Sequence, residues 1–285
     1  MPPTADPAAP AGGQKVALIT GGSRGIGRAA AEALAARGYA VALAARALDA
    51  APGEPAGLNE TAARIRDAGG RVLPVFLDLS DAATIPAAVE AVLSEWGRVD
   101  ALVNNAIAVL PASVTRVLQT DPASLEELLA ANVVAPTRLV QAVLPGMLER
   151  GDGVIVNVLS EVANEDPPGT VEEGGWGFGY AAVKAALQRL AGVLQVEVGD
   201  QGVRAYGFMP GSVWTDSVRA AYPTDEAARA AREHYAFLEP EVPGAAIAWL
   251  VDDPAARAEA GQVMDVREMM TRADIALAAP TSAAP

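Results

Sequence analysis

Seven short apolar runs, separated by longer stretches with helical spacing, restrict the fold of this chain more than any other feature. The runs consist almost entirely of Val, Ile, Leu and Ala, as in KVALIT and GVIVNVLS, without alternating polar residues. Strands that are buried on both faces have this pattern. The stretches between them, such as GRAAAEALAARG and PAAVEAVLSEWG, are amphipathic. This repeated order predicts an α/β fold with a parallel sheet and helices on both faces.

No composition shift interrupts this pattern between residues 14 and 270, so we expect one domain there. The ends, 1–13 and 271–285, are rich in Pro, Ala and Gly, and predict a disordered N-terminal tail and a flexible C-terminal tail. Two connections, 47–59 and 161–179, exceed the usual loop length. Such loops are typically either functional or disordered.

Composition removes several classes of function. The net charge of −14 would repel phosphate backbones, which argues against a nucleic-acid partner. The chain has no cysteine and one histidine, His234, so thiol chemistry and a His-rich metal site are not expected. No uninterrupted apolar stretch is long enough to span a membrane, and the N-terminus does not resemble a secretory signal. We therefore expect a cytoplasmic protein with no membrane partner.

The stretch VALITGGSRGIG, residues 16–27, places three glycines where the first strand ends and a helix begins. At such a point the backbone N–H groups and the helix dipole can hold a phosphate. Gly21 would permit the tight turn, and Gly25 and Gly27 would allow a pyrophosphate and the neighbouring strand to approach. A P-loop is excluded because no Gly-Lys-Ser/Thr follows. The alternative is a tight turn without a ligand.

The segment YAAVK places Tyr180 and Lys184 four residues apart, on one face of a predicted helix. An ammonium group near a phenol favours the phenolate and lowers its pKa. Tyr180 is therefore a candidate general acid/base. The alternative is a surface helix with an incidental lysine, but Lys15 and Lys184 are the only lysines in the chain.

The spacing of TGGSRGIG, together with YAAVK and three further motifs in the same order, resembles the short-chain dehydrogenase/reductase family. The resemblance covers residues 14–268 and implies a single-domain, Rossmann-like, doubly wound parallel sheet of about seven strands. It also implies an oxidoreductase that uses a nicotinamide cofactor.

The resemblance implies the role of each catalytic residue. Ser160, at the end of GVIVNVLS, would hold the substrate carbonyl, and Tyr180 would transfer the proton. Lys184 would tune Tyr180 and bind the nicotinamide ribose. Asn132 would hold a water that relays protons. Ser160 and Tyr180 are twenty positions apart, several more than is usual in the family, so we expect an enlarged loop at the mouth of the cleft.

The same resemblance implies the cofactor contacts. Asn105 and Ala106 would line the adenine ribose, although Ile107 stands where the family has glycine, and a β-branched residue resists positive φ. Asp78 would meet the adenine amino group, or it could instead cap the next helix, a role for which Ser80 and Asp81 compete. The expected cofactor-binding residues are Gly21, Ser23, Arg24, Gly25, Ile26, Gly27, Arg46, Asp78, Leu79, Asn105, Ala106, Tyr180, Lys184, Pro210, Gly211, Val213 and Thr215.

The second apolar run indicates which cofactor is preferred. Ala45 stands where NAD-binding enzymes place an acidic residue, and Arg46 follows it. Arg24 in the glycine loop adds a second positive charge. Two arginines near one point favour the 2′-phosphate, so we expect NADP(H), with NAD(H) as the other cofactor to test.

Features near the predicted cleft suggest a small, apolar carbonyl or alcohol substrate. Six aromatic residues would lie near the cleft: Trp176, Phe178, Trp214, Tyr222, Tyr235 and Phe237. The loop after Ser160 carries five acidic residues: Glu161, Glu165, Asp166, Glu172 and Glu173. If this loop borders the cleft, it would disfavour anionic substrates, and otherwise it is simply a solvated loop.

We therefore predict an NADP(H)-dependent oxidoreductase that interconverts a carbonyl and an alcohol. The alternatives are a non-catalytic dinucleotide-binding regulator or scaffold on the same fold, and an enzyme that uses bound NAD for epimerisation or dehydration. Family members are commonly tetramers or dimers, and the alanine-rich AAVKAALQRLAGVL would permit close helix packing. We thus expect a homotetramer or homodimer.

Overall fold

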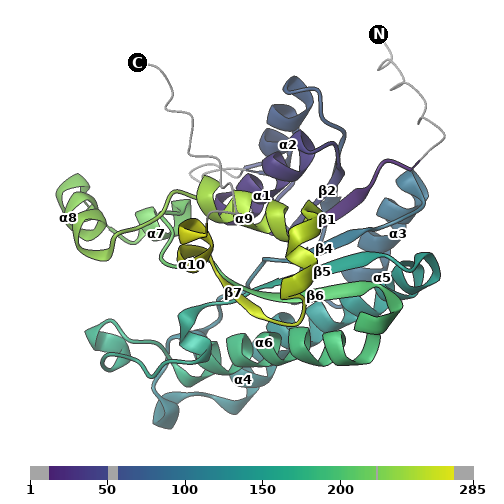
Figure 1. The fold of residues 1–285 in the computed structure, drawn as a ribbon. Helices are drawn as coiled ribbons and strands as arrows, with labels where there is room; N and C mark the ends of the chain where they lie inside the picture. The colour runs from purple at the N-terminus through teal and green to yellow at the C-terminus, as the bar shows by residue number, and fades with distance from the viewer. Residues whose placement is uncertain (1–12, 51–56, 223, 273–285) are drawn as a thin grey trace.

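The chain folds around a seven-stranded sheet in which every neighbouring pair is parallel (Figure 1). The structure, a computed structural model, describes residues 13–50, 57–222 and 224–272. The strand order is β3-β2-β1-β4-β5-β6-β7. The strands are β1 (Val16–Thr20), β2 (Ala40–Ala45), β3 (Val72–Phe76), β4 (Ala101–Asn104), β5 (Gly153–Val158), β6 (Val203–Met209) and β7 (Val263–Asp265).

The direction of winding reverses between β1 and β4. The chain proceeds from β1 outward to β3, and then from β4 outward to β7 on the other side. Ile19 of β1 pairs with Val103 of β4, so the loops after these two strands start next to each other. In an open parallel sheet, such a switch point leaves a crevice for ligands at the carboxyl ends of the strands.

Helices cover both faces of the sheet, as Figure 1 shows. One face carries α1 (Gly25–Ala36), α2 (Leu58–Asp67), α9 (Glu241–Asp252) and α10 (Val266–Thr271). The other carries α3 (Thr84–Trp96), α5 (Ala135–Arg150) and α6 (Phe178–Val198). The helix α4 (Pro122–Leu129) precedes α5. Finally, α7 (Asp216–Ala220) and α8 (Asp225–Tyr235) form an arm that projects at the left of Figure 1.

Strand β1 shows why the apolar runs are uninterrupted. Ala17 and Ile19 pack into the core beneath α1 and α9, whereas Val16 and Leu18 pack into the core beneath α3 and α5. All four side chains are at most 1% exposed. Because both faces of the strand are buried, its first four positions are apolar, and the one polar residue, Thr20, lies at its carboxyl end with its hydroxyl hydrogen-bonded.

The segment Pro122–Arg150 is one almost continuous helical run. Within the described residues it is the one helix with the length and apolar composition to cross a membrane, a property that core helices of soluble proteins share. Its apolar side chains, including Leu139 and Val143, pack in the core against the sheet. A π turn over Ala130–Val134 joins α4 to α5 and carries Asn132. Such turns often occur at functional sites.

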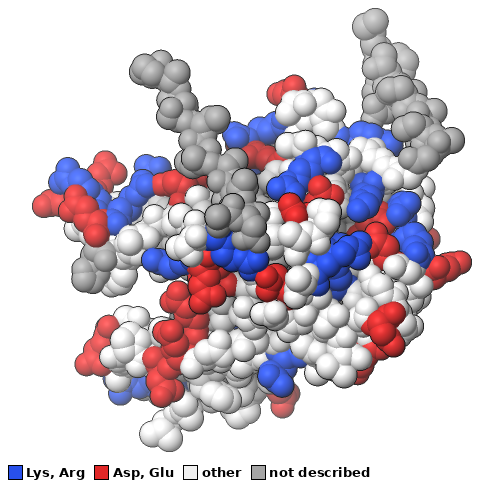
Figure 2. Space-filling view, viewed as in Figure 1, with Lys and Arg blue, Asp and Glu red and all other residues white. Residues whose placement is uncertain are grey.

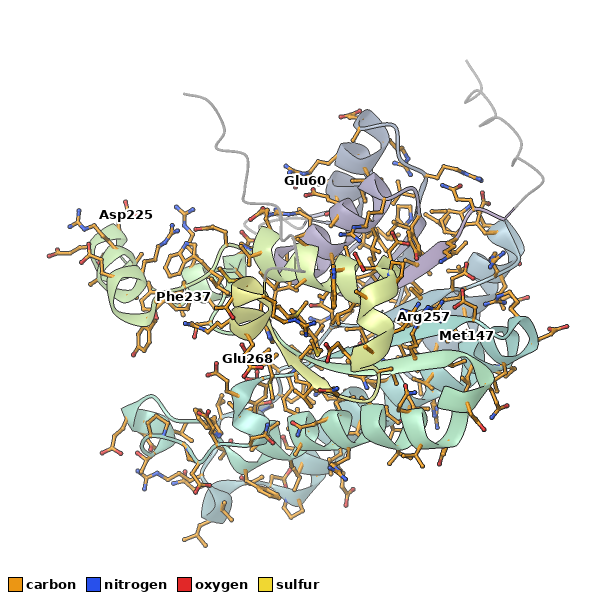
Figure 3. All side chains as sticks on the ribbon, in the orientation of Figure 1. Glu60, Met147, Asp225, Phe237, Arg257 and Glu268 are labelled. Atoms are coloured by element: carbon orange, nitrogen blue, oxygen red, sulfur yellow. The ribbon has the colours of Figure 1, made fainter. Side chains whose placement is uncertain are left out.

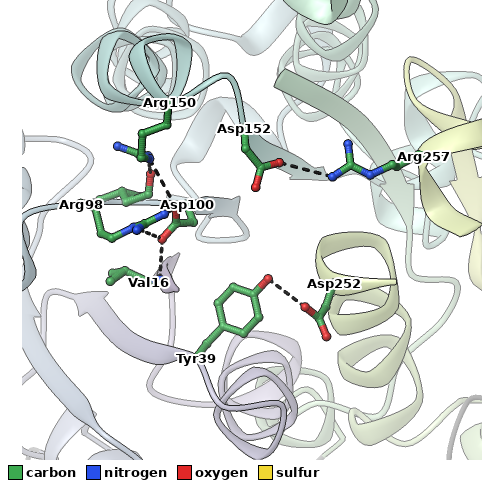
Figure 4. Close-up of polar contacts among 9 residues, drawn as sticks. Val16, Tyr39, Arg98, Asp100, Arg150, Asp152, Asp252 and Arg257 are labelled. Carbon is green, nitrogen blue, oxygen red and sulfur yellow. Dashed lines mark hydrogen bonds and ion pairs between the residues drawn. The ribbon is translucent and has the colours of Figure 1, made fainter. Parts of the chain in front are cut away.

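A buried carboxylate, that of Asp100, lies at the amino edge of the sheet, which is the edge opposite the crevice (Figure 4). Asp100 is 4% exposed and accepts a hydrogen bond from the backbone N–H of Val16 at 2.8 Å. Arg98 donates to both carboxylate oxygens, at 2.8 and 2.5 Å, and Arg150 approaches within 3.5 Å. A charge this deeply buried needs such partners. The cluster joins the start of β1 to the start of β4.

The predicted doubly wound sheet of seven strands is confirmed, strand for strand. The predicted tails lie outside the described residues, apart from Gly13, Thr271 and Arg272. Thr271 belongs to α10, and Arg272 Nη1 donates to Glu259 Oε1 at 2.6 Å, so these two residues of the predicted C-terminal tail pack with the folded domain.

The two long loops are present, but each ends two residues before its predicted boundary, because α2 begins at Leu58 and α6 at Phe178. Residues 51–56 of the first lie outside the described residues. The second contains two short 3₁₀ turns, Glu161–Ala163 and Val171–Glu173, before α6 begins at Phe178. The prediction of an enlarged loop between Ser160 and Tyr180 thus agrees with the structure.

Candidate active site

A cavity of about 580 Å³ lies at the carboxyl edge of the sheet. Residues that follow six of the strands line it, together with residues of α1, α6 and α7. Of the residues predicted for catalysis or cofactor binding, those that line the cavity are Gly21, Ser23, Arg24, Gly25, Ile26, Arg46, Asp78, Leu79, Asn105, Ala106, Ser160, Tyr180, Lys184, Pro210, Gly211, Val213 and Thr215. The two that do not are Gly27 and Asn132.

The glycine loop brings bare backbone to the cavity at the start of α1. Gly21 and Gly25 have φ angles of +71° and +55°, which disfavour any residue with a side chain. Arg24, at the N-cap, makes no side-chain capping bond, and the first turn of α1 contains no acidic residue. The N–H groups of this turn are therefore not capped by a side chain of α1 itself. They fit an anionic group such as a pyrophosphate.

Gly27 lies beneath the loop and allows close packing. A Cβ atom at this position would lie 2.2 Å from the carbonyl oxygen of Gly21 and 2.5 Å from Asn105 Nδ2. Gly27 is therefore a glycine that allows the loop after the neighbouring strand to approach closely, as predicted. Its contact with a cofactor stays a prediction, since it does not line the cavity.

Thr20 and Asn105 join the ends of β1 and β4 at the switch point. The hydroxyl oxygen of Thr20 accepts hydrogen bonds from the backbone N–H groups of Asn105 and Ala106, both at 3.0 Å. The Asn105 side chain donates to the carbonyl of Thr20 at 2.9 Å. These bonds hold the two loops in a fixed relation. Ile107 lines the cavity without positive φ, so the backbone here accommodates the replacement of glycine.

Asn132 braces the loop after β4. It is 2% exposed, and its Oδ1 accepts from the backbone N–H of Ala108 at 2.8 Å. Its Nδ2 donates to the carbonyls of Ala108 and Leu128, at 2.8 and 3.1 Å. These bonds explain why a poor helix former occupies the middle of a helix. Both polar atoms of the side chain are used in these hydrogen bonds. The role of Asn132 in a proton relay stays a prediction.

Ser160 and Tyr180 meet in the cavity from different elements. Ser160 follows β5 with an extended backbone, and Tyr180 lies in the first turn of α6. Burial raises the pKa of the Tyr180 phenol, and a hydrogen bond with the Ser160 side chain partly opposes this rise. Because both residues line the same cavity, their hydroxyl groups can both be reached by a substrate bound there.

The net lowering of the Tyr180 pKa that we expected from Lys184 is not found. Burial raises the pKa of the phenol instead, and Lys184 is not among the causes of the shift. Lys184 is 5% exposed and its Nζ donates to the carbonyl of Val158 at 2.9 Å. Burial lowers the pKa of Lys184 itself to about 8. Desolvation therefore dominates both groups.

The low pKa of Lys184 predicts a pH dependence of stability. Its pKa is 10.5 in the unfolded chain and about 8 when folded, so between these values the unfolded chain binds more protons. The free energy of unfolding should therefore rise with pH across this window. Relative to Lys184→Met, the wild type should gain up to about 3 kcal/mol between about pH 7 and pH 10.5, measured by urea unfolding. A difference that stays constant with pH would contradict this.

Two arginines give one end of the cavity a positive charge. Arg24 and Arg46 both line it, and neither forms an ion pair with a carboxylate of the described residues. The lining includes Ala45, where an acidic residue would otherwise select a ribose hydroxyl. Guanidinium groups without partners suit a phosphate.

Asp78 is the one carboxylate among the described residues that line the cavity. Its Oδ1 accepts from the backbone N–H of Ser80 at 2.9 Å. The alternative in which Asp78, Ser80 or Asp81 caps the next helix is wrong, because α3 begins at Thr84 and Ala83 is its N-cap. The three residues instead form the turns that precede this helix.

The six aromatic residues expected near the cleft do not line the cavity. Four of them pack against one another where the arm begins. Trp214 stacks on Tyr222 with ring centres 5.7 Å apart and contacts Phe237 at 5.1 Å, and Tyr235 contacts Phe237 at 5.8 Å. A backbone bridge between Val213 and Leu238 forms the base of the arm. The sequence placed these residues correctly along the chain but could not show which way their side chains face.

The acidic residues of the loop after Ser160 also lie outside the lining of the cavity. Glu172 forms an ion pair with Arg116, with Nη2 and Oε2 2.8 Å apart, and Glu173 accepts from the backbone N–H of Thr170 at 2.9 Å. The structure therefore favours the alternative of a solvated loop over a loop that repels anionic substrates.

Several lining residues were not predicted from the sequence. These are Ala44, Ala47, Leu77, Ala108, Val109, Val158, Leu159, Ser217 and Val218. Leu77 and Leu159 follow strands and Val158 is the last residue of β5, so the rule that pointed to Ser160 could have found them. Ser217 and Val218 lie on α7, and only the tertiary structure brings this helix to the cavity.

Comparison with known proteins gives consistent results. A family model described as short chain dehydrogenase matches residues 15–226. D-threitol dehydrogenase of Mycolicibacterium smegmatis is 34% identical over 247 residues, 85% of this chain and 87% of that protein. The 3-oxoacyl-[acyl-carrier-protein] reductase FabG of Escherichia coli is 34% identical over 209 residues, 72% of this chain and 76% of that protein. A short chain dehydrogenase of Pseudocercospora fijiensis is 35% identical, and the match spans 60% of its length.

Solved structures resemble the whole fold. The crystal structure of gox2181 has a TM-score of 0.76 at 26% identity and covers 88% of this chain and 93% of that one. A structure from Beutenbergia cavernae, described as a candidate NAD(P)-dependent gluconate 5-dehydrogenase with NADP bound at low occupancy, has a TM-score of 0.72 at 29% identity. It covers 88% of this chain and 94% of that one.

Proposed function

The chain belongs to the short-chain dehydrogenase/reductase family of NAD(P)-dependent oxidoreductases acting on CH–OH and C=O groups, and from this premise we propose its reaction. It interconverts a carbonyl and an alcohol on a small substrate, with NADP(H) as the preferred cofactor. One observation carries the proposal: Ser160, Tyr180 and Lys184 line the same cavity as the glycine loop that precedes α1.

The hydroxyl groups of Ser160 and Tyr180 hold the substrate oxygen and transfer its proton. When bound, the nicotinamide cofactor supplies or accepts the hydride at the carbonyl carbon. In the direction of reduction, the Tyr180 phenol donates its proton to the oxygen as the alcohol forms. Its raised pKa keeps the phenol protonated at neutral pH, which suits a proton donor. Ser160 donates a hydrogen bond to the developing alkoxide.

Lys184 and Asn132 support this proton transfer. Lys184 Nζ, held by the carbonyl of Val158, would return a proton toward Tyr180 after each turnover. Its pKa of about 8 lies close to neutral pH, where a group exchanges protons most readily. The side chain of Asn132 holds the loop after β4 in place. Because its amide oxygen and nitrogen are already hydrogen-bonded, a proton relay at this residue would use its other atoms.

Fluorescence titration with NADPH and NADH tests the cofactor proposal. Arg24 and Arg46 would hold the 2′-phosphate, so NADPH should bind at least about tenfold more tightly than NADH. The variant Arg46→Gln should weaken binding of NADPH and leave NADH unchanged. Arg138→Gln, an exposed arginine on α5 outside the cavity, is the matched control. Tighter binding of NADH would overturn the preference, and binding of neither would overturn the proposed function.

The remaining parts of the proposal concern the whole molecule. We propose that residues 14–270 form one cofactor-binding and catalytic domain, that the protein acts in the cytoplasm and that it assembles as a homotetramer or homodimer. Exposed apolar residues on α6 and on the π turn before α5 support the assembly, since Val134, Val193 and Val196 are 45%, 47% and 86% exposed. Its partners would then be other copies of the chain and a small carbonyl or alcohol substrate.

A further inference from the structure

A second cavity, of about 490 Å³, lies within the arm. Its lining residues are Trp214, Arg219, Asp225, Ala228, Arg229, Arg232 and Glu233, and it shares none of them with the first cavity. Both cavities border α7, because Ser217 and Val218 line the first while Arg219 lines the second. The second cavity is therefore a further candidate site that borders the same short helix as the first.

One face of α8 forms most of the second cavity. Its lining residues recur every three or four positions, so their side chains share that face: Asp225, Ala228 and Arg229 in one turn, and Arg232 and Glu233 in the next. The arm projects from the body (Figure 1), with Asp225 at its outer end and Phe237 at its root (Figure 3). Thr224 caps α8 by accepting a hydrogen bond from the N–H of Ala227 at 3.1 Å.

Trp214 and Arg232 form a fixed wall of this cavity. The Arg232 guanidinium lies 5.2 Å from the centre of the Trp214 ring and pairs with Glu239. The Trp214 ring also stacks on the Tyr222 ring. Arg232 is thus neutralised and held in place, and its partners leave it little capacity for a ligand.

Arg219 and Arg229 differ from Arg232 in this respect. Neither lies within 4 Å of a carboxylate of the described residues. Two carboxylates also line the cavity, those of Asp225 and Glu233, and blue and red side chains alternate on the arm in Figure 2. Asp225 lies in the first turn of α8, where the helix N–H groups stabilise a negative charge. The cavity therefore contains two guanidinium groups without partners, in a chain whose net charge is −14.

We propose that the arm cavity binds a small oxyanion, a carboxylate or phosphate group, held between Arg219 of α7 and Arg229 of α8. A guanidinium group presents two parallel N–H donors that match the oxygens of either anion. An anion bridging the two helices would also fix α7, which borders the first cavity. The site does not depend on the proposed oxidoreductase activity, so each can be tested separately.

Calorimetric titration with inorganic phosphate, and with acetate against neutral acetamide, tests the site directly. The protein should first be saturated with NADPH, so that the anion cannot bind at the glycine loop. If NADPH does not bind, the variant Arg24→Gln/Arg46→Gln serves the same purpose. We expect phosphate or acetate to bind at one site per chain and acetamide not to bind. No binding of either anion would overturn the proposal.

Arginine variants locate the bound anion. The double variant Arg219→Gln/Arg229→Gln should weaken binding by about tenfold or more, because both charge-assisted contacts are lost. Both arginines are exposed, so the variant should fold, which circular dichroism would check. Arg219→Lys/Arg229→Lys keeps the charge but loses the paired donors. Its affinity for the anion should therefore lie between that of the wild type and that of the glutamine variant. An equal loss in the control double variant Arg66→Gln/Arg257→Gln, which changes two exposed arginines that line neither cavity, would overturn the assignment.

Kinetics would distinguish two sources of the anion. If the anion is the distal end of a substrate, phosphate should compete with a keto acid but not with the matching keto amide. If it is a free oxyanion acting through α7, phosphate should change the kinetics of both substrates alike. In either case, the Arg219→Gln/Arg229→Gln variant should abolish the effect of phosphate. Persistence of the effect in this variant would contradict the assignment.

Discussion

Replacing Tyr180 with Phe is expected to lower kcat by about 10³-fold and to leave the Kd for NADPH unchanged. The substitution removes one hydroxyl group from a residue that lines the cavity and keeps the ring that fills the space. That hydroxyl is the proton donor of the proposed reaction, and it shares a hydrogen bond with Ser160. Steady-state assays at saturating NADPH and a fluorescence titration would measure the two quantities.

Tyr222→Phe is the matched control for this experiment. It makes the same chemical change on a tyrosine that stacks on Trp214 and does not line the first cavity. The control should keep its kcat for a neutral carbonyl substrate. If Tyr180→Phe also kept most of its kcat, Tyr180 would not be the proton donor. If the wild type bound NADPH but turned over no carbonyl or alcohol, the non-catalytic alternative would be favoured.

Replacing Gly27 with Ala should both destabilise the protein and impair cofactor binding. The added Cβ would meet the carbonyl oxygen of Gly21 at 2.2 Å and Asn105 Nδ2 at 2.5 Å, and the first of these is backbone that cannot turn away. The loop must therefore shift, at a cost of about 3 kcal/mol in the free energy of unfolding. Because Gly21 lines the cavity, NADPH binding should weaken as well. Urea unfolding and the NADPH titration would measure these effects.

Gly192→Ala is the control, and its expected effect on stability has the opposite sign. Gly192 lies inside α6, has no atom within 4 Å of the added Cβ and does not have positive φ. Alanine lowers the entropy of the unfolded chain and favours the helix, so stability should rise by roughly 0.5–1 kcal/mol. Equal stability changes in the two variants would show that the space beneath the glycine loop is not the deciding factor.

The motifs at strand ends were predictable because they depend on local rules. The apolar run before Ser160 and the glycines after Thr20 each combine a buried strand with a loop at its carboxyl end. In a parallel sheet these loops share one edge, so the predicted residues had to converge there. The structure indeed places Ser160 and Gly21 in one cavity.

Charge and orientation were less predictable. Sequence spacing placed Lys184 one turn after Tyr180, but the lysine bonds to the carbonyl of Val158 and both pKa values follow burial. Burial depends on which elements close over a group, and spacing along a helix does not report it. The aromatic residues of the arm illustrate the same limit, since Trp214 packs on Tyr222 and not in the cavity.

The sequence by itself determined the seven strands, their parallel arrangement and the loops that carry the candidate site. These follow from local hydrophobic pattern and from the requirement that strands buried on two faces be covered by helices. Only the tertiary structure decided that Asn132 braces the loop at Ala108, that α7 borders the first cavity and that Arg219 and Arg229 both line a second one. Each of these depends on contacts between segments distant in the chain, and such contacts leave no periodic signal in the sequence.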